Sequence, residues 1–220
     1  MNSIHKTDFH SLWDTCLSEN RARYINSSSQ YRKQTIFAGD ILLRYALLSE
    51  KLDISKVKIG YGKNGKPYIK NGGIHFNLSH SKNLVVLGIG KQELGIDILC
   101  ERKINKELIK YFFSEEEQRY LHHLKEGKQD YYWNALCYKE AYIKCSGGKI
   151  INMKNRLVCP KDLQYGKVNR VKQEREQIES IFFKASNYHI CMISNNISRK
   201  LNIEILDMDI IHRKIEGLIS

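Results

Sequence analysis

The sequence predicts an α+β fold built from two halves, residues 1–100 and 101–220. Two observations predict it: a segment with helical apolar spacing precedes strand-length apolar segments before residue 100, and helical segments again precede strands after it. No sequence repeat relates the two halves. With 220 residues, 42% of them hydrophobic, the chain is long enough to bury a core without disulfides.

The first half is expected to contain one long helix and several strands. Apolar residues between Ile36 and Leu52 recur at steps of four, four, three and four, which places them on one face of a helix. Residues 57–70 carry short apolar pieces on either side of turn-forming residues, which predicts strand, turn and strand. A three-stranded meander is then expected from the apolar segments 74–79, 84–90 and 93–99.

Two helices are expected to open the second half. Ser114 and Glu117 form a capping box at the start of the first helix. Asp130 is the expected N-cap of the second helix, which runs through Lys144 and ends at the glycine pair 147–148 in a left-handed conformation. Four further segments have the composition of strands: 167–171, 180–186, 187–194 and 201–206.

Net charge, motifs, apolar runs and cysteine spacing together limit the class of protein. The formal net charge of +12 attracts polyanions, phosphorylated small molecules or acidic protein surfaces. The chain has no helix-turn-helix, zinc-finger or aromatic RNA-binding motif, so no nucleic-acid partner is expected. We expect a cytoplasmic protein without a membrane partner, because no apolar run has the length of a membrane span or a signal-peptide core. The cysteines form no C-x-x-C pair and are expected to be reduced: Cys16, Cys100, Cys137, Cys145, Cys159 and Cys191.

Two carboxylates interrupt apolar patterns. Asp97 lies between isoleucines in a strand that is apolar on both faces, where a charge is costly unless it is paired or bound to a cation. Glu140 interrupts the apolar face of the predicted second helix, one turn before Lys144. A buried salt bridge or a surface i,i+4 ion pair between Glu140 and Lys144 also explains the spacing, and spacing alone favours this structural role.

A hydroxyl and an imidazole, Ser79 and His80, end the alternating segment of the first half at an expected sheet edge. Considered alone, they are typical of a turn-capping hydroxyl and a surface histidine.

Four fragments, taken in order, resemble the motifs of the 4′-phosphopantetheinyl transferases, of the longer type that activates surfactin synthetase. They are Gly65-Lys66-Pro67, HFNLSHS at 75–81, Gly95-Ile96-Asp97 and KEAYIK at 139–144. The resemblance covers roughly residues 65–144, and the segment 32–44 looks like the first helix of that family. It implies two similar α+β halves in a pseudo-twofold arrangement, with the active site at their interface.

The resemblance also implies a reaction. Members of the family transfer the 4′-phosphopantetheine arm of coenzyme A to a serine of an acyl, peptidyl or polyketide carrier protein and release adenosine 3′,5′-bisphosphate. By this resemblance Asp97 and Glu140 hold Mg²⁺, and Glu140 and Lys144 are the catalytic residues, with Glu140 or a water as the base. The residues implied to contact the coenzyme A phosphates are Arg23, Lys66, Ser79, His80 and Lys144, and Lys139 lies beside the site.

One position departs from the family pattern, because Leu99 stands where the metal-binding strand usually has a second acid. Either a water takes that place or Leu99 packs into the core. Glu101 shares a strand face with Asp97 but lies too far along the strand to substitute.

The partner and the competing functions follow from the same resemblance. The carrier is expected to dock on a monomer through Ile104, Phe112 and Phe113, with core packing as the alternative for the two phenylalanines. The alternative function is a coenzyme A-binding or carrier-binding protein with weak or no turnover. A metal nuclease is less well supported, because its usual Glu-x-Lys strand is absent.

Overall fold

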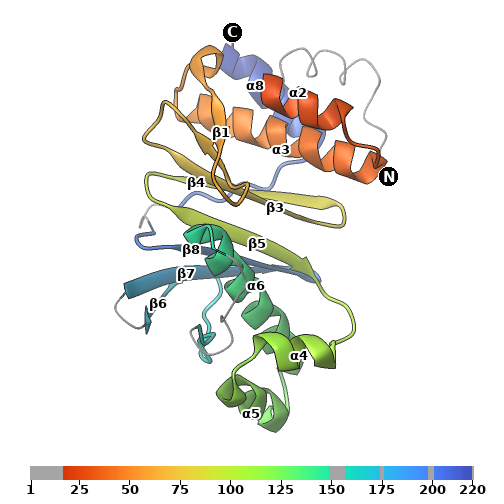
Figure 1. Cartoon of the computed structure of the whole chain (residues 1–220), viewed down its shortest axis with the longest axis vertical. Helices are drawn as coiled ribbons and strands as arrows, with labels where there is room; N and C mark the ends of the chain where they lie inside the picture. Colours follow the sequence, from red (N-terminus) through yellow and green to blue (C-terminus); the bar gives the residue numbers. More distant parts are fainter. Residues whose placement is uncertain (1–16, 149–156, 174–175, 198–200, 220) are drawn as a thin grey trace. The chain divides into compact units, whose positions relative to one another are not determined.

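The computed structural model of this chain describes residues 17–148, 157–173, 176–197 and 201–219. Helices and antiparallel strands both contribute, as Figure 1 shows, which confirms the α+β class. Cys16 lies outside the described residues, whereas the other five cysteines are free thiols. Within the described ranges, no helix combines the length and the hydropathy that a bilayer span requires.

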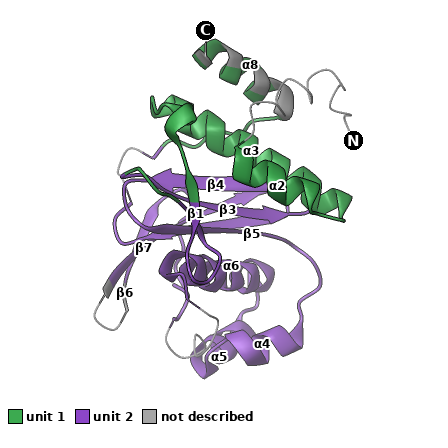
Figure 2. Cartoon of the chain, turned by 45° about the horizontal axis from the view of Figure 1, so that its top comes forward, with its two compact units in different colours: residues 1–59, 69–72, 202–220 green, residues 60–68, 73–201 purple. Residues whose placement is uncertain are grey.

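The chain divides into two compact units (Figure 2). Unit 1 contains Met1–Ile59, Ile69–Gly72 and Asn202–Ser220, and unit 2 contains Gly60–Tyr68 and Gly73–Leu201. These boundaries differ from those of the expected halves, 1–100 and 101–220, which stay a prediction.

Unit 1 is built mainly from helices: α2 (Ser18–Ile25), α3 (Gln30–Ser49), the short 3-10 helix η1 (Ile54–Lys56) and α8 (Met208–Ile219). The helix expected from residue 36 is confirmed, and it starts earlier, where the Ser29 side chain caps it by accepting from the Arg32 amide. Phe37 and Ile41 of α3 form a buried core with Ile211 and Ile215 of α8.

The strand expected at 201–206 is wrong. This segment has no regular secondary structure and leads into α8. Two of its alternating apolar residues, Ile203 and Ile205, are exposed, so the alternation does not bury a sheet face. The i,i+4 pair Ile211 and Ile215 instead supplies the buried face of α8.

The turn-rich segment after η1 forms a hairpin. The strands β1 (Ile59–Tyr61) and β2 (Pro67–Ile69) pair with each other, as expected for the turn-rich segment 57–70. Gly65 lies in the turn at a φ of 79°, a conformation that glycine adopts without strain.

Unit 2 contains two antiparallel sheets. One consists of β3 (His75–Ser81) and β4 (Leu84–Gly90), and the other has the order β5-β8-β7-β6. The second sheet comprises β5 (Leu94–Cys100), β6 (Val168–Gln173), β7 (Glu176–Ala185) and β8 (Tyr188–Ser194). Three of the expected C-terminal strands are therefore confirmed.

The expected three-stranded meander is wrong in one pairing, because β5 pairs along its length with β8. β3 contacts β5 through side chains: Asn77 Oδ1 accepts from the Ile96 amide at 2.9 Å, and Ser81 Oγ accepts from the Cys100 amide at 3.1 Å. Polar side chains of β3 thus satisfy backbone donors of β5 that a neighbouring strand would otherwise bind.

Among its described residues, unit 2 also has the helices α4 (Lys106–Phe112), α5 (Glu115–His123) and α6 (Lys128–Ser146). The sequence did not predict the short helices α2 and α4, whereas the capping box of α5 is confirmed. Gly127, and not Asp130, is the N-cap of α6, because the helix starts at Lys128. Asp130 lies in its first turn, where its carboxylate pairs with Lys184. Gly147 ends α6 with a φ of 61°, as expected.

The core of unit 2 forms where α6 packs on β5 and β8 (Figure 1). Every residue of α6 from 131 to 139 is buried, so the helix is covered on all sides there rather than along one stripe. Tyr132 stacks on Phe113, which is fully buried, with ring centroids 5.6 Å apart. For Phe113, this burial favours the core-packing alternative over a role in a docking surface.

Candidate active site

The site centres on Asp97, which lies in the middle of β5 and is 5% exposed. Its Oδ1 accepts from Ser79 Oγ of β3 at 2.8 Å and from Lys144 Nζ of α6 at 2.6 Å. Lys144 Nζ also donates to Ser79 Oγ at 2.7 Å. The three side chains, which come from three separate elements, thus close a ring of charge-assisted hydrogen bonds.

The second carboxylate oxygen of Asp97 has a different environment. Asp97 Oδ2 is buried and finds no hydrogen-bond partner among the described residues. An unpaired buried carboxylate oxygen is unfavourable and is an oxygen donor of the kind that hard divalent cations prefer.

Glu140 supplies a second carboxylate near Asp97. It lies half-buried on α6, and burial raises the pKa of its carboxyl group. The negative charge of Asp97 raises this pKa further, and the ammonium group of Lys144 opposes the increase. Two carboxylates that repel each other in a partly buried site form a pair that a cation would stabilise. Lys144 forms its ion pair with Asp97, so the i,i+4 pair between Glu140 and Lys144 that the spacing suggested does not explain the position of this lysine.

Gly95 explains how α6 comes close enough to bring these groups together. A Cβ atom at this position would collide with the Ala141 carbonyl oxygen and the Cys145 backbone nitrogen of α6. The glycine of the Gly-Ile-Asp fragment is therefore required by close helix–strand packing. Cys137 fixes the same contact, because its Sγ donates to the backbone carbonyls of Asp97 at 3.2 Å and His189 at 3.5 Å.

His80 follows Ser79 on β3 and is exposed. Partial burial of the ring lowers the pKa of its imidazole, the positive charge of Lys144 lowers it further, and Asp97 opposes these effects. The electrostatic fields of both Lys144 and Asp97 therefore act on His80.

Lys66 ties three segments together. Its Nζ binds Glu93 at 2.6 Å and donates to the carbonyl oxygens of Leu94 and Cys145, each at 3.1 Å. Cys145 directly follows Lys144 in the sequence, so Lys66 contacts the backbone of α6 one residue beyond the lysine of the ring. It also lines a pocket of about 250 Å³ together with Tyr68 and Phe76.

The structure does not place Arg23 or Lys139 at the site around Asp97. Arg23 is exposed on α2 of unit 1, whereas all the residues above belong to unit 2, so its role stays a prediction. Lys139 is fully buried and pairs with the buried Glu117 at 2.9 Å. This pair corrects the expectation that the Lys139 side chain lies beside the site, and the sequence offered no spacing that would have identified it.

Leu99 packs against the main core of unit 2. The structure therefore favours the core-packing interpretation over a water in place of an acid. Glu101 is held elsewhere, with its Oε1 at 2.8 Å from His189 Nε2 and at 3.0 Å from Lys184 Nζ. It does not supply the missing carboxylate.

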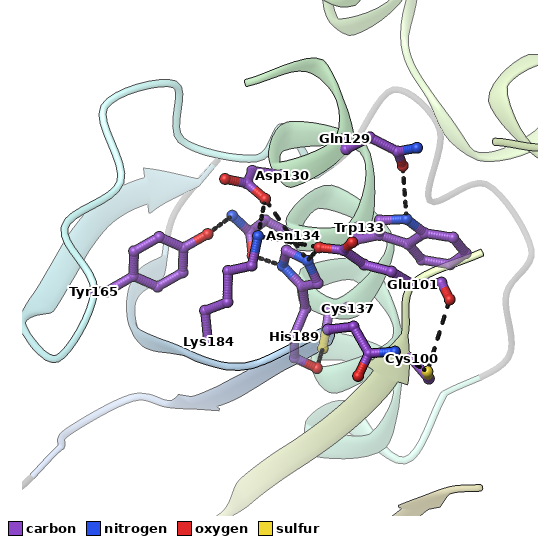
Figure 3. Close-up of polar contacts among 11 residues, drawn as sticks. Cys100, Glu101, Gln129, Asp130, Trp133, Asn134, Cys137, Tyr165, Lys184 and His189 are labelled. Atoms are coloured by element: carbon purple, nitrogen blue, oxygen red, sulfur yellow. Dashed lines mark hydrogen bonds and ion pairs between the residues drawn. The ribbon is translucent and has the colours of Figure 1, made fainter. Parts of the chain in front are cut away.

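Figure 3 shows the polar cluster around His189, which sequence analysis missed. His189 is fully buried, with Nδ1 at 2.9 Å from Asn134 Oδ1. Glu101, Asp130 and His189 offer ligand atoms within 4.8 Å of one another, a spacing that could hold a metal ion. The ammonium group of Lys184 already pairs with both carboxylates and offsets one of their two negative charges, so the cluster is accounted for as a structural network.

The comparisons with known proteins define the class. Residues 93–193 match the model of the 4′-phosphopantetheinyl transferase superfamily, a span that includes Asp97, Glu140 and Lys144. The resemblance to this superfamily that was identified from the motifs of the chain is confirmed.

The particular relatives are of the expected longer type. The chain is 32% identical over 152 residues to the 4′-phosphopantetheinyl transferase gsp of Aneurinibacillus migulanus, covering 66% of this chain and 62% of the relative. It is 35% identical over 112 residues to Sfp of Bacillus subtilis, covering half of each protein, and 30% identical over 158 residues to HetI of Nostoc sp., covering 67% of this chain and 66% of HetI. The chain thus spans between half and about two thirds of these relatives.

Proposed function

We propose that this chain transfers the 4′-phosphopantetheine arm of coenzyme A to a serine of an apo carrier protein and releases adenosine 3′,5′-bisphosphate. The observation that carries the proposal is the environment of Asp97, a buried carboxylate with one oxygen bound by Ser79 and Lys144 and the other unpartnered among the described residues. The match of residues 93–193 to the superfamily and the names of the similar proteins support the same activity.

Asp97 and Glu140 fit the requirements of a Mg²⁺ site. Both offer carboxylate oxygens, the unpaired Oδ2 of Asp97 lacks a partner, and the two negative charges repel each other in the absence of a cation. When bound, Mg²⁺ would neutralise the pyrophosphate of coenzyme A and make the departing nucleotide a better leaving group.

The remaining chemistry is assigned to the protein's own side chains. The serine oxygen attacks the phosphorus that carries the pantetheine, and the bond from this phosphorus to the nucleotide breaks. Glu140 accepts the serine proton, directly or through a water. Lys144 stabilises the charge on the phosphates. Ser79, His80, Lys66 and Arg23 are the proposed further contacts of coenzyme A.

The pocket beside Lys66 is a suitable place for the nucleotide part of coenzyme A. It combines a lysine with the rings of Tyr68 and Phe76, which match a phosphate and a base. Lys66, which lines this pocket, donates a hydrogen bond to the carbonyl oxygen of Cys145, the residue that follows Lys144.

The proposed partner is an acyl, peptidyl or polyketide carrier domain bound by a monomer. Ile104 and Phe112 remain candidates for docking, because both are partly buried at the edge of the core, and Tyr111 beside them is 63% exposed. The expected cytoplasmic location stays a prediction.

One experiment tests the function. The protein is incubated with coenzyme A, Mg²⁺ and several apo carrier domains, and the carriers are weighed by mass spectrometry. We expect at least one carrier to gain the mass of one phosphopantetheine, and Asp97→Asn to abolish the gain. If no carrier gains mass while a curated relative such as Sfp modifies the same set, the proposed activity is wrong.

A second candidate is a protein that binds coenzyme A or a carrier without turnover. The packing of Leu99 in the core favours it, because the strand then lacks a second metal-binding acid. Tight binding of coenzyme A measured by calorimetry, together with the absence of any mass gain on the carriers, would identify this function.

A further inference from the structure

A cation already lies at the carboxylate of the candidate site. Lys144 Nζ is 2.6 Å from Asp97 Oδ1 and 2.7 Å from Ser79 Oγ. These are short, charge-assisted contacts on a carboxylate that is almost completely buried. The ammonium group therefore binds one of the oxygens that a divalent cation would use.

The net negative charge of the site is small for a site that binds a divalent cation. Asp97 and Glu140 contribute two negative charges, and Lys144 neutralises one of them. Leu99 contributes none, and Glu101 is paired with Lys184 and His189. A divalent cation bound beside Asp97 would also face the Lys144 ammonium within a few ångström, where like charges repel strongly.

Lys144 can leave this position more easily than Asp97. Its side chain is 29% exposed, whereas that of Asp97 is 7% exposed. Lys144 also lies two residues before the end of α6, on a long flexible side chain. An anionic ligand that reaches the ammonium group from solvent could therefore draw it off the carboxylate without moving β5.

We propose that Lys144 is an internal counter-ion of Asp97 that keeps the affinity for divalent cations low until a pyrophosphate-bearing ligand binds the lysine. The inference rests on the proposed function and deepens it by assigning the regulation of metal binding to one side chain. By linkage, the ligand and the cation raise each other's affinity by the same factor, and Lys144 accounts for a large part of that factor.

The test measures binding of Mn²⁺ alone, in the absence of coenzyme A, from the electron paramagnetic resonance signal of the free ion. Lys144→Met removes the charge and keeps most of the side-chain length, and we expect it to bind Mn²⁺ at least about tenfold more tightly than the wild type. Lys144→Arg keeps the charge and should bind Mn²⁺ as weakly as the wild type. Lys128→Met, on the exposed first turn of the same helix, is the matched control and should leave the affinity unchanged.

Two further measurements complete the test. Adding Asp97→Asn to Lys144→Met should remove the gain in affinity, which assigns the gain to this carboxylate. Pyrophosphate or coenzyme A should tighten Mn²⁺ binding to the wild type, after correction for the ion that the free ligand binds, and should do so less in Lys144→Met. The proposal is overturned if Lys144→Met binds Mn²⁺ alone no more tightly than the wild type, or if Lys144→Arg gains as much as Lys144→Met.

The outcome is separable from that of the proposed function. The Mn²⁺ titration needs neither coenzyme A nor a carrier, so a gain in Lys144→Met supports the counter-ion role even if the wild type transfers nothing. Conversely, transfer by the wild type with no change in Mn²⁺ affinity in Lys144→Met would retain the function and overturn this inference. Thermal melting of each variant confirms that the compared proteins are folded.

Discussion

The two oxygens of Asp97 have different partners, and this difference determines what the residue can do. Oδ1 is bound by a hydroxyl and an ammonium group, whereas Oδ2 is buried without a partner in the described part of the chain. A purely structural ion pair would gain from satisfying both oxygens. The arrangement instead resembles a site in which one ligand atom is kept available.

Substitution of the carboxylates should separate activity from stability. We expect Asp97→Asn and Glu140→Gln each to lower the transfer rate on the order of a thousandfold, because loss of a metal ligand removes several kcal/mol of transition-state stabilisation. The melting temperature of Glu140→Gln in metal-free buffer should not fall, because burial and Asp97 disfavour its charged form. Carrier modification and thermal melting check this. Near-wild-type rates at saturating coenzyme A and Mg²⁺ would show that the metal ligands are misassigned.

The position of Leu99 gives a second prediction. Because Leu99 packs against the main core, Leu99→Glu should bury part of an unpaired carboxylate and lower the free energy of unfolding by roughly 1–3 kcal/mol. Leu84→Glu, at a 39% exposed position of β4, is the control and should have little effect. Urea denaturation measures both. A stable Leu99→Glu variant that binds Mg²⁺ more tightly would instead support the alternative that a water takes the place of the second metal-binding acid.

The buried histidine predicts a pH dependence of stability. Burial lowers the pKa of His189 from its ordinary value of 6.5, the charge of Lys184 adds to this, and Glu101 and Asp130 oppose it. The unfolded chain therefore binds a proton more readily than the folded protein does. Stability is full above about pH 6.5 and falls as the pH decreases below it, by up to about 1.4 kcal/mol for each unit by which the pKa is depressed.

Denaturation at several pH values tests this assignment. His189→Gln should lose the decrease in stability that begins below about pH 6.5. His122→Gln, at an exposed position of α5, should retain it. An equal slope in the wild type and His189→Gln would show that another group causes the pH dependence.

At the residue level the sequence identified the central groups and missed their partners. Asp97 and Glu140 were recognisable because a charge within an apolar pattern requires compensation. The structure brings Ser79, Asp97 and Lys144 together as the motifs implied, whereas Lys139 pairs with Glu117. Partners distant in sequence, such as Glu117 and Lys139, cannot be found from spacing because tertiary packing alone brings them together.

At the level of elements, local sequence signals predicted the helix ends correctly, whereas the pairing of strands was not predicted correctly. The capping box of α5 and the glycine end of α6 depend only on neighbouring residues, and both are confirmed. The partner of β5 and the fate of residues 201–206 depend on which face the rest of the chain covers. Alternation of apolar residues therefore predicted a strand at 201–206 that has no strand partner.

The close contact between β5 and α6 predicts how a methyl group added at Gly95 affects stability. Gly95→Ala should lower the free energy of unfolding by about 3 kcal/mol or more, because its Cβ would meet backbone atoms of α6 that cannot rotate away. Gly90→Ala, on β4, meets only a Leu94 side-chain atom at 3.4 Å and should change stability by about 1 kcal/mol or less.

Denaturant titration of the two glycine variants, with transfer assayed below the unfolding transition, checks this prediction. Any folded Gly95→Ala protein should have a displaced α6 and hence a reduced rate, since Glu140 and Lys144 lie on this helix. Equal stabilities for the two variants would contradict the claim that the glycine is required by close packing.

At the scale of the whole molecule, the net charge of +12 affects the encounter with a partner more than the chemistry. If acidic carrier domains are the substrates, the positive field should speed their association, and raising NaCl from about 50 to about 500 mM should lower kcat/KM for the carrier roughly tenfold. The value of kcat at saturating carrier should change little, because the step after association does not depend on the long-range field. A carrier variant with its surface acids neutralised is the control and should show a weak salt response from a lower starting kcat/KM. Steady-state assays across the salt series distinguish the cases: an equal fall in kcat would locate the effect in the site, and a flat kcat/KM for the acidic carrier would contradict electrostatic docking.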